Sequence, residues 1–313
     1  MLKPASAQRH PFISLLLLLL LMIAGAVTFM LLAFIAVITI YGMKEMLNAS
    51  TGSASSIEVI KLLQLFISTG MFIVPALFFA RLESQNWTAY LRLKEFPSVL
   101  ILITLLIMIS SGPMLELSAE LNRNMNLPYF LRDLEQWMLI KELEMSEMTK
   151  QLLTMNTPGV LIFNIFMLAI IPAVGEELIF RGCLQKIFAK WTGNKHVAIW
   201  VTAIIFSAIH VQFYGFLPRM LLGALFGYLL VWSRTIWIPI LSHFINNAVA
   251  VITAFVYQQK GISLDKLEQP DPVAYYVYII SFLACSFLLW IFYTTSLRYS
   301  LNLSDRTDGS RLD

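Results

Sequence analysis

Long runs of apolar residues, separated by short polar stretches, dominate the hydrophobic pattern of this chain. A helix needs about 20 apolar residues to cross the hydrocarbon core of a bilayer. Eight runs meet or approach that length, and they cover approximately residues 12–41, 59–80, 97–117, 158–178, 196–213, 215–233, 236–257 and 274–296. Pro113 lies within the third run, and we expect it to interrupt that helix. The pattern predicts an all-α, polytopic transmembrane helix bundle of about eight spans.

Two of the segments at the N-terminal end need a separate interpretation. The first run is much longer than the apolar core of a signal peptide, which is about 7–15 residues, so we interpret it as a retained membrane helix. Residues 47–57 are rich in Ser, Ala and Gly, which is typical of a short flexible loop.

The longest loop, about 118–157, precedes the fourth span and has a pattern of its own. Beyond Pro128, which can open a helix, Leu and Met residues recur at mostly helical spacing with charged residues between them. This pattern predicts an amphipathic helix that lies on the membrane surface or caps the bundle. We favour a structural cap, with a substrate-gating element as the alternative.

Composition agrees with a lipid environment. The chain is 58% hydrophobic and 13% charged, and its mean hydropathy is +0.74, whereas about a quarter of a soluble domain is charged. The net charge of +3 gives no indication of a nucleic-acid partner. Most Lys and Arg residues lie in the termini and the even-numbered loops, which predicts that both termini are cytoplasmic. The short loops favour a bacterial protein of the plasma (inner) membrane.

The sequence Gly-Glu-Glu-Leu-Ile-Phe-Arg, beginning at Gly175, places two adjacent carboxylates near the end of the fourth span. Glu177 and Arg181 are four residues apart with the acid first, which is the favourable order for an ion pair on one helix face. Glu176 points about 100° away and is left to face a cavity. The alternative is that both acids cap the membrane end in water.

Polar residues also occur in the fifth and seventh predicted spans. In the fifth, Phe206 and His210 share a helix face, and in the seventh, His243 and Asn247 do so. A lone histidine is often a packing residue, and a buried amide often binds another helix. Ionisable groups within membrane helices are nevertheless costly, rare and usually functional. Their coincidence on three helices favours one shared site.

These side chains are sufficient for hydrolysis of a peptide bond by water. Glu176 would take a proton from water, and His210 would help to hold that water. His243 and Asn247 would stabilise the tetrahedral intermediate. Two histidines and a carboxylate also make an open zinc site, so the cofactor is undetermined between none and zinc. The chain has no His-Glu-x-x-His zinc motif and no Gly-x-Ser-x-Gly nucleophile motif.

Three motifs in this order resemble those of the CAAX protease and bacteriocin-processing family, also called Abi, which includes the type II CAAX prenyl endopeptidases. They are Glu-Glu-x-x-x-Arg at 176–181, Phe-x-x-x-His at 206–210 and His-x-x-x-Asn at 243–247. The resemblance implies that Glu176 and His210 activate water and that His243 and Asn247 stabilise the oxyanion. Both metal-dependent and metal-free mechanisms are argued for the family.

The resemblance divides the chain into three parts. Residues 1–157 would form N-terminal membrane helices and the amphipathic segment, residues 158–257 the catalytic core, and residues 258–313 the last span and a cytoplasmic tail. The resemblance implies an intramembrane endopeptidase that acts on a membrane-embedded or lipid-anchored peptide, such as a prenylated or bacteriocin-like substrate. The alternatives are a non-catalytic immunity or scaffold protein and a proton-coupled transporter.

Overall fold

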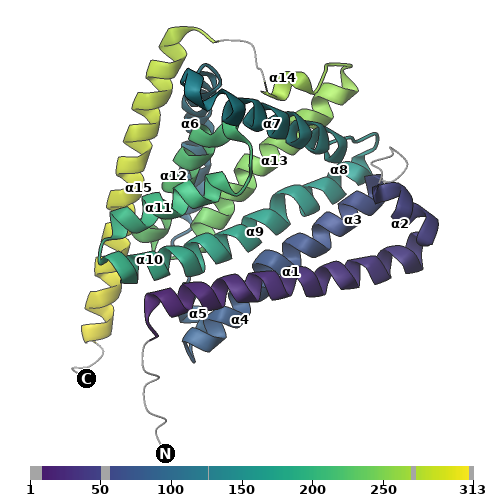
Figure 1. The fold of residues 1–313 in the computed structure, drawn as a ribbon. Coiled ribbons are helices and arrows are strands. Elements are labelled where there is room, and N and C mark those ends of the chain that lie inside the picture. The colour runs from purple at the N-terminus through teal and green to yellow at the C-terminus, as the bar shows by residue number, and fades with distance from the viewer. Residues whose placement is uncertain (1–8, 51–56, 126, 269–272, 310–313) are drawn as a thin grey trace, which may run out of the picture.

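The computed structural model describes residues 9–50, 57–125, 127–268 and 273–309, and within these ranges the chain is helical and contains no strand. In Figure 1 the helices form one bundle. Its elements, including short π- and 3₁₀-helical segments labelled η, are α1 (Pro11–Tyr41), α2 (Met43–Ser50), α3 (Ile57–Ser68), η2 (Thr69–Ile73), α4 (Val74–Glu83), α5 (Trp87–Tyr90), α6 (Val99–Arg123), η3 (Tyr129–Leu131), α7 (Arg132–Leu152), α8 (Pro158–Asn164), η4 (Ile165–Ile170), α9 (Ile171–Glu177), η5 (Leu178–Leu184), α10 (Gln185–Thr192), α11 (Lys195–Ala208), η6 (Phe213–Gly215), α12 (Phe216–Ser233), α13 (Trp237–Gln259), α14 (Asp265–Glu268) and α15 (Tyr275–Gly309).

Seven helical stretches in the described part of the chain are long and apolar enough to cross a membrane, and α11 is a shorter apolar helix. The seven are Pro11–Tyr41, Ile57–Glu83, Val99–Arg123, Pro158–Thr192, Phe213–Ser233, Trp237–Gln259 and Tyr275–Tyr299. With α11 they correspond to the eight predicted stretches. The prediction of a polytopic helix bundle is confirmed, and the chain is a membrane protein.

The fourth of these stretches is longer than the hydrophobic pattern predicted. It continues from Pro158 to Thr192, through the π-helical segments η4 and η5, instead of ending near residue 178. Glu176 therefore lies near the middle of a helix, about 24 Å from Thr192 at helical rise. The alternative in which the acidic pair caps a membrane end is wrong, because the helix continues beyond it.

Helix α11 is shorter than the fifth predicted span, because it ends at Ala208. Its 14 residues extend about 21 Å, which is less than the hydrocarbon core of about 30 Å. The chain then turns and returns through η6 and α12, which packs against α11. The turn that contains His210 is thus placed at about the same depth as Glu176.

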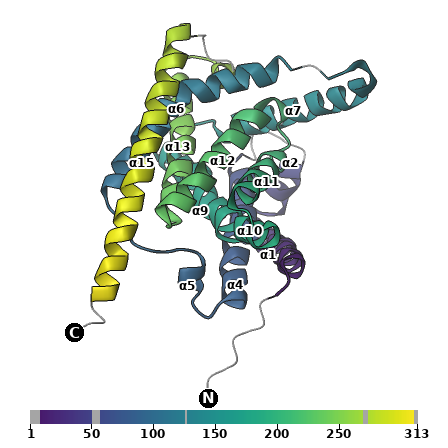
Figure 2. The ribbon, with the colours of Figure 1, turned by 90° about the vertical axis from the view of Figure 1, so that its left-hand side faces the viewer.

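The amphipathic helix predicted before the fourth span is present as α7, with the 3₁₀-helical segment η3 between Pro128 and its start. In Figures 1 and 2, α7 lies at the end of the bundle opposite the start of α1 and the end of α15. The ring centroids of Trp137 in α7 and Phe213 in η6 are 5.3 Å apart. Helix α7 therefore covers the turn between α11 and α12.

One local prediction was wrong, and the bounds of another need correction. Helix α6 continues through Pro113. Neighbouring helices stabilise such turns in a membrane, and here the Ser281 hydroxyl of α15 donates to the Ser110 carbonyl in the turn before the proline. In the predicted loop 47–57, residues 47–50 form the end of α2 and Ile57 begins α3, while 51–56 lie outside the described residues.

Close contact between glycines explains how α1 packs, although few of its residues are buried. A Cβ atom added to Gly25 would lie 2.0 Å from the carbonyl oxygen of Gly70 in η2, and one added to Gly70 would lie 2.3 Å from the Cβ of Phe29. Small residues allow membrane helices to approach at backbone distance. The Gly25–Gly70 contact thus fixes α1 against the helix Ile57–Glu83.

Candidate active site

Residues from all three motifs meet between four segments of the bundle. Helix α9 and η5 contribute the acidic pair and the arginine, α11 and its following turn the phenylalanine and histidine, and α12 and α13 the remaining side chains. In that order the residues are Glu176, Glu177, Arg181, Phe206, His210, Arg219, Phe226, His243 and Asn247.

Glu177 connects the first motif to the third. Its Oε1 accepts hydrogen bonds from Arg181 Nη1 at 2.9 Å and from His243 Nδ1 at 2.9 Å. Glu177 and Arg181 are both 0% exposed. The predicted pair of Glu177 with Arg181 is present, but sequence reasoning missed the contact with His243. Helical spacing describes one helix and gives no information about the partner of that helix.

Arg181 is held from several sides. Besides its bond to Glu177, its Nη2 donates to the Gly223 carbonyl of α12 at 3.0 Å. Its guanidinium carbon lies 4.6 Å from the centroid of the Phe206 ring and 5.4 Å from that of Phe226. A buried charge is tolerated only with a partner and hydrogen bonds, and Arg181 has both. The arginine therefore joins η5 to α11 and α12.

Glu176 and His243 face each other without a direct hydrogen bond. His243 Nε2 lies 3.9 Å from Glu176 Oε2, which exceeds hydrogen-bonding distance. Because His243 Nδ1 faces the Glu177 carboxylate, Nδ1 carries the proton in the neutral form of the ring, and Nε2 is then an acceptor. Glu176 Oε2 is buried and has no hydrogen-bond partner among the described residues. Two acceptors thus converge at a distance that one water molecule can bridge.

His210 approaches this pair through an aromatic contact. Its Nδ1 donates to the Phe206 carbonyl at 2.7 Å, which leaves Nε2 as the acceptor of the neutral ring. The Phe206 ring lies 5.1 Å from the His210 ring and 5.9 Å from the His243 ring, centroid to centroid. Within the described residues, His210 forms neither a hydrogen bond nor an ion pair with Glu176. The Phe206 ring therefore contacts both histidine rings.

The amide of Asn247 is partly engaged. Its Nδ2 donates to the Leu168 carbonyl of η4 at 3.2 Å, and its Oδ1 accepts from Asn246 Nδ2 at 3.2 Å. One of its two N–H groups therefore holds α13 against η4, and the second is available to a ligand.

Sequence reasoning overlooked Arg219, the cation of α12. Its guanidinium donates to the Gln212 carbonyl at 3.3 Å and to Gln212 Oε1 at 2.7 Å. It also interacts electrostatically with Glu176, His210 and Glu142. An arginine between apolar residues of a predicted span was the available signal, because such residues are functional by default.

The turn between α11 and α12 is fastened by side chains of earlier elements. Asn122 of α6 donates to the Phe213 carbonyl at 3.1 Å and accepts from the Leu217 amide at 2.7 Å. Glu142 of α7 accepts from the Tyr214 amide at 3.2 Å. These contacts satisfy backbone groups that a bilayer would leave unpaired.

The donor atoms do not fit a three-ligand zinc centre. Such a centre needs ligands about 2.0–2.2 Å from one ion. Among the described residues, no group of three His, Cys, Asp or Glu side chains is placed to hold a metal ion. Glu176 and His243 face each other, and the described residues place no third ligand with them.

Comparison with known proteins points to one family. Residues 158–249 match the family model described as Type II CAAX prenyl endopeptidase Rce1-like. The Uncharacterized protein YpbD of Bacillus subtilis (strain 168) is 29% identical over 90 residues, which cover 28% of this chain and 43% of that protein. The match thus spans less than half the length of this relative. No solved structure matches the chain. The resemblance predicted from the motifs is confirmed over residues 158–249, the segment that contains every residue of the three motifs and is similar to the Rce1-like type II CAAX prenyl endopeptidases.

Proposed function

We propose that this chain is an intramembrane endopeptidase that hydrolyses a peptide bond of a membrane-embedded or lipid-anchored substrate, with residues 158–257 as the catalytic core. The observation that carries the proposal is the approach of Glu176 Oε2 to His243 Nε2 at 3.9 Å inside the bundle. The match of residues 158–249 to an endopeptidase family supports it.

In this proposal Glu176 and His243 hold the attacking water together, so His243 has a different role from the oxyanion stabilisation predicted from the motifs. A water molecule has two O–H groups, and the carboxylate and the imidazole nitrogen each accept one. Glu177 keeps the His243 ring in this orientation, because its carboxylate accepts the Nδ1 proton at 2.9 Å. A carboxylate behind a histidine fixes both the tautomer and the ring position. Glu177 therefore positions His243.

The reaction requires two proton transfers, one from the water to Glu176 and one from Glu176 to the leaving nitrogen. Glu176 takes a proton from the water as its oxygen bonds to the scissile carbonyl carbon. The tetrahedral intermediate then breaks its C–N bond, and the leaving nitrogen receives that proton. Asn247 offers its second N–H group to the oxyanion, and Arg219 supplies positive charge nearby. Because both O–H groups of the water are already accepted, a role of His210 in holding it stays a prediction from the motifs.

Cleavage by the purified protein tests the proposal. We expect the full chain in liposomes to cleave a fluorogenic prenylated peptide. Replacing Glu176 by Gln should lower the rate about 10²–10⁴-fold, because the general base is lost while the side-chain volume is kept. The matched control is Glu58→Gln, which neutralises an exposed carboxylate at the start of α3.

Thermal unfolding in detergent should show that both variants are folded. A Glu176→Gln variant that cleaves at the wild-type rate would falsify the assignment of the base. If no membrane-anchored peptide is cleaved by the wild type, and its cellular function survives Glu176→Gln, the protein is a non-catalytic partner. Substrate-dependent flux into liposomes would instead indicate a transporter.

A further inference from the structure

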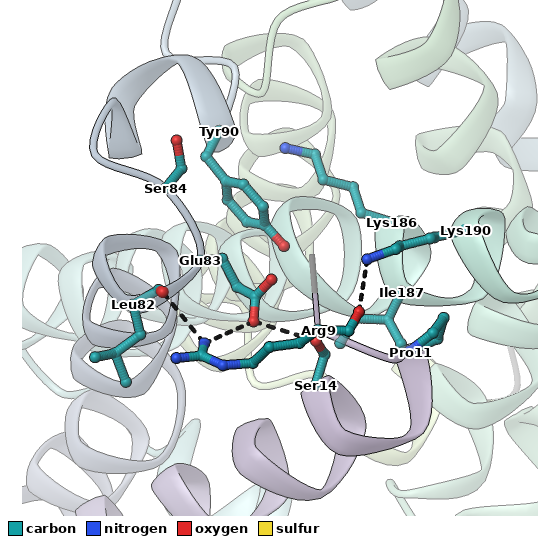
Figure 3. Close-up of a pocket in the computed structure, with 10 residues that line it drawn as sticks. All are labelled: Arg9, Pro11, Ser14, Leu82, Glu83, Ser84, Tyr90, Lys186, Ile187 and Lys190. Atoms are coloured by element: carbon teal, nitrogen blue, oxygen red, sulfur yellow. Dashed lines mark hydrogen bonds and ion pairs between the residues drawn. The ribbon is translucent and has the colours of Figure 1, made fainter. Parts of the chain in front are cut away.

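A cavity of about 400 Å³ lies away from the candidate active site, where α1 begins and α4 and α10 end. Figure 3 shows its lining, which includes Arg9, Glu83, Tyr90, Lys186 and Lys190. Its volume is within the range of about 300–1,000 Å³ that small-molecule sites occupy.

Positive charge exceeds negative charge in this cavity. Among the described residues, Glu83 is the only carboxylate that lines the cavity, and Arg9 Nη1 already binds it at 2.9 Å. Lys190 Nζ donates to the Arg9 carbonyl at 2.7 Å, which leaves two of its three N–H donors for a ligand. In Figure 3 dashed lines join these residues, whereas none reaches Lys186.

The ammonium group of Lys186 contacts an aromatic ring and has no anionic partner among the described residues. Its Nζ lies 4.2 Å from the centroid of the Tyr90 ring, and no carboxylate of the described residues lies within ion-pair distance of it. Arg92, another cation, interacts with it electrostatically. A mostly buried ammonium group beside a second cation needs an anion to offset the repulsion.

Tyr90 adds a neutral hydrogen-bond donor. Burial raises the pKa of its hydroxyl, with smaller contributions from Cys183 and Glu83. The hydroxyl therefore keeps its proton at neutral pH and remains able to donate to an anion.

The cavity lies at the depth of lipid headgroups. Three candidate membrane stretches begin or end around it, at Pro11, Glu83 and Thr192. Figure 1 shows the start of α1 and the end of α10 at the same end of the bundle. A ligand there is reached both from the lipid and from the adjacent water.

We propose that this cavity binds a phosphate group, carried by an anionic phospholipid headgroup, through Lys186, Lys190 and the Tyr90 hydroxyl. Basic pockets between membrane helices bind such headgroups, and lysine ammonium groups bind phosphate as point charges. Soluble phosphate offers the same chemistry, so the experiment must separate the two sources. The proposal is independent of peptidase activity.

Lipid retention by the full-length protein tests the proposal. The protein is placed in nanodiscs that contain phosphatidylcholine and phosphatidylglycerol, and the bound lipids are measured by native mass spectrometry after extraction. We expect the wild type to retain phosphatidylglycerol preferentially. The double variant Lys186→Gln/Lys190→Gln should reduce this preference about tenfold or more, because it removes both ammonium groups that would face the anionic headgroup.

The matched control is Lys195→Gln, which removes a lysine at the start of α11 that does not line the cavity. The variant Tyr90→Phe keeps the aromatic ring beside Lys186 and removes only the hydroxyl. It should reduce the preference for phosphatidylglycerol several-fold, and it tests the proposal if the double variant does not fold. In a parallel arm, inorganic phosphate is added and the melting temperature is measured.

The phospholipid headgroup is supported as the ligand if the wild type and the control retain phosphatidylglycerol preferentially and the cavity variants do not. A melting temperature raised by inorganic phosphate in the wild type alone supports the phosphate site with a soluble source. The proposal is overturned if the wild type retains both lipids equally and does not respond to phosphate. It is also overturned if Lys195→Gln loses as much as the cavity variants.

Discussion

Two carboxylates that are adjacent in the sequence have different surroundings in the fold. Glu177 is fully buried, and its Oε1 accepts hydrogen bonds from Arg181 and His243, whereas Glu176 approaches His243 at 3.9 Å without a hydrogen bond. The Oε2 atom of each carboxylate lacks a hydrogen-bond partner among the described residues. A buried ion pair contributes little net stability, but breaking it is costly, because the remaining charge is uncompensated. Replacing Glu177 should therefore reduce the stability of the protein more than replacing Glu176.

We predict that Glu177→Gln destabilises the protein by about 3–5 kcal/mol, because Arg181 is left as a buried charge and His243 loses its acceptor. Glu176→Gln should change stability much less. Thermal unfolding of both variants in the same detergent measures the difference. Equal melting temperatures for the two variants would contradict the distinction drawn between them.

At the scale of elements, π-helical segments occur in two of the membrane stretches, Ile57–Glu83 and Pro158–Thr192. Segment η5 follows Glu177 directly and carries Arg181, and η2 carries Gly70, which contacts α1. A π-turn changes the rotation of every residue beyond it, and such turns are frequent at functional sites. They let η5 direct Arg181 and the residues after it toward α11 and α12.

The glycine contact between α1 and η2 gives a second prediction. Gly25→Ala should destabilise the protein by about 1–3 kcal/mol, because its Cβ would overlap the Gly70 carbonyl oxygen. The control is Gly112→Ala in α6, where a Cβ meets nothing within 4 Å. That change should be neutral or stabilising by up to about 1 kcal/mol. A Gly25→Ala protein as stable as the Gly112→Ala protein would show that the helices do not approach so closely.

Hydrophobic patterning predicted the helices well and their contacts poorly. The beginning of the stretch at Pro158 was predicted from length and polarity, but its end was placed near residue 178 and lies at Thr192, because the polar residues beyond Glu176 resemble a membrane boundary. Spacing along one helix predicted the pair of Glu177 and Arg181. The contact of Glu177 with His243 depends on the packing of α9 against α13, which no local pattern encodes.

For the whole molecule, the fold places the loop between α4 and α5 and the segment before α7 at opposite ends of the helix bundle. Gln85 lies between α4 and α5 near the start of α1, whereas Tyr129 precedes α7 at the other end. The distribution of Lys and Arg predicts that the end with Gln85 faces the cytoplasm.

Cysteine labelling tests this orientation. In a background with Cys183→Ala and Cys285→Ala, we expect Tyr129→Cys to react with a membrane-impermeant maleimide in intact cells, since this position is 86% exposed. Gln85→Cys should react only after the cells are permeabilised. Labelling of both positions from outside, or the reverse pattern, would refute the predicted topology.

The short length of α11 has a consequence for the synthesis of the protein. A helix that extends about 21 Å cannot cross the bilayer alone, so α11 and α12 must enter it together as a hairpin. The side chains that satisfy their turn, Asn122 and Glu142, belong to earlier parts of the chain and are already present when the hairpin emerges. His243 follows only with α13. The ribosome must therefore synthesise His243 before the Glu176–His243 pair can form, so the proposed activity arises only after α13 has been added to the nascent chain.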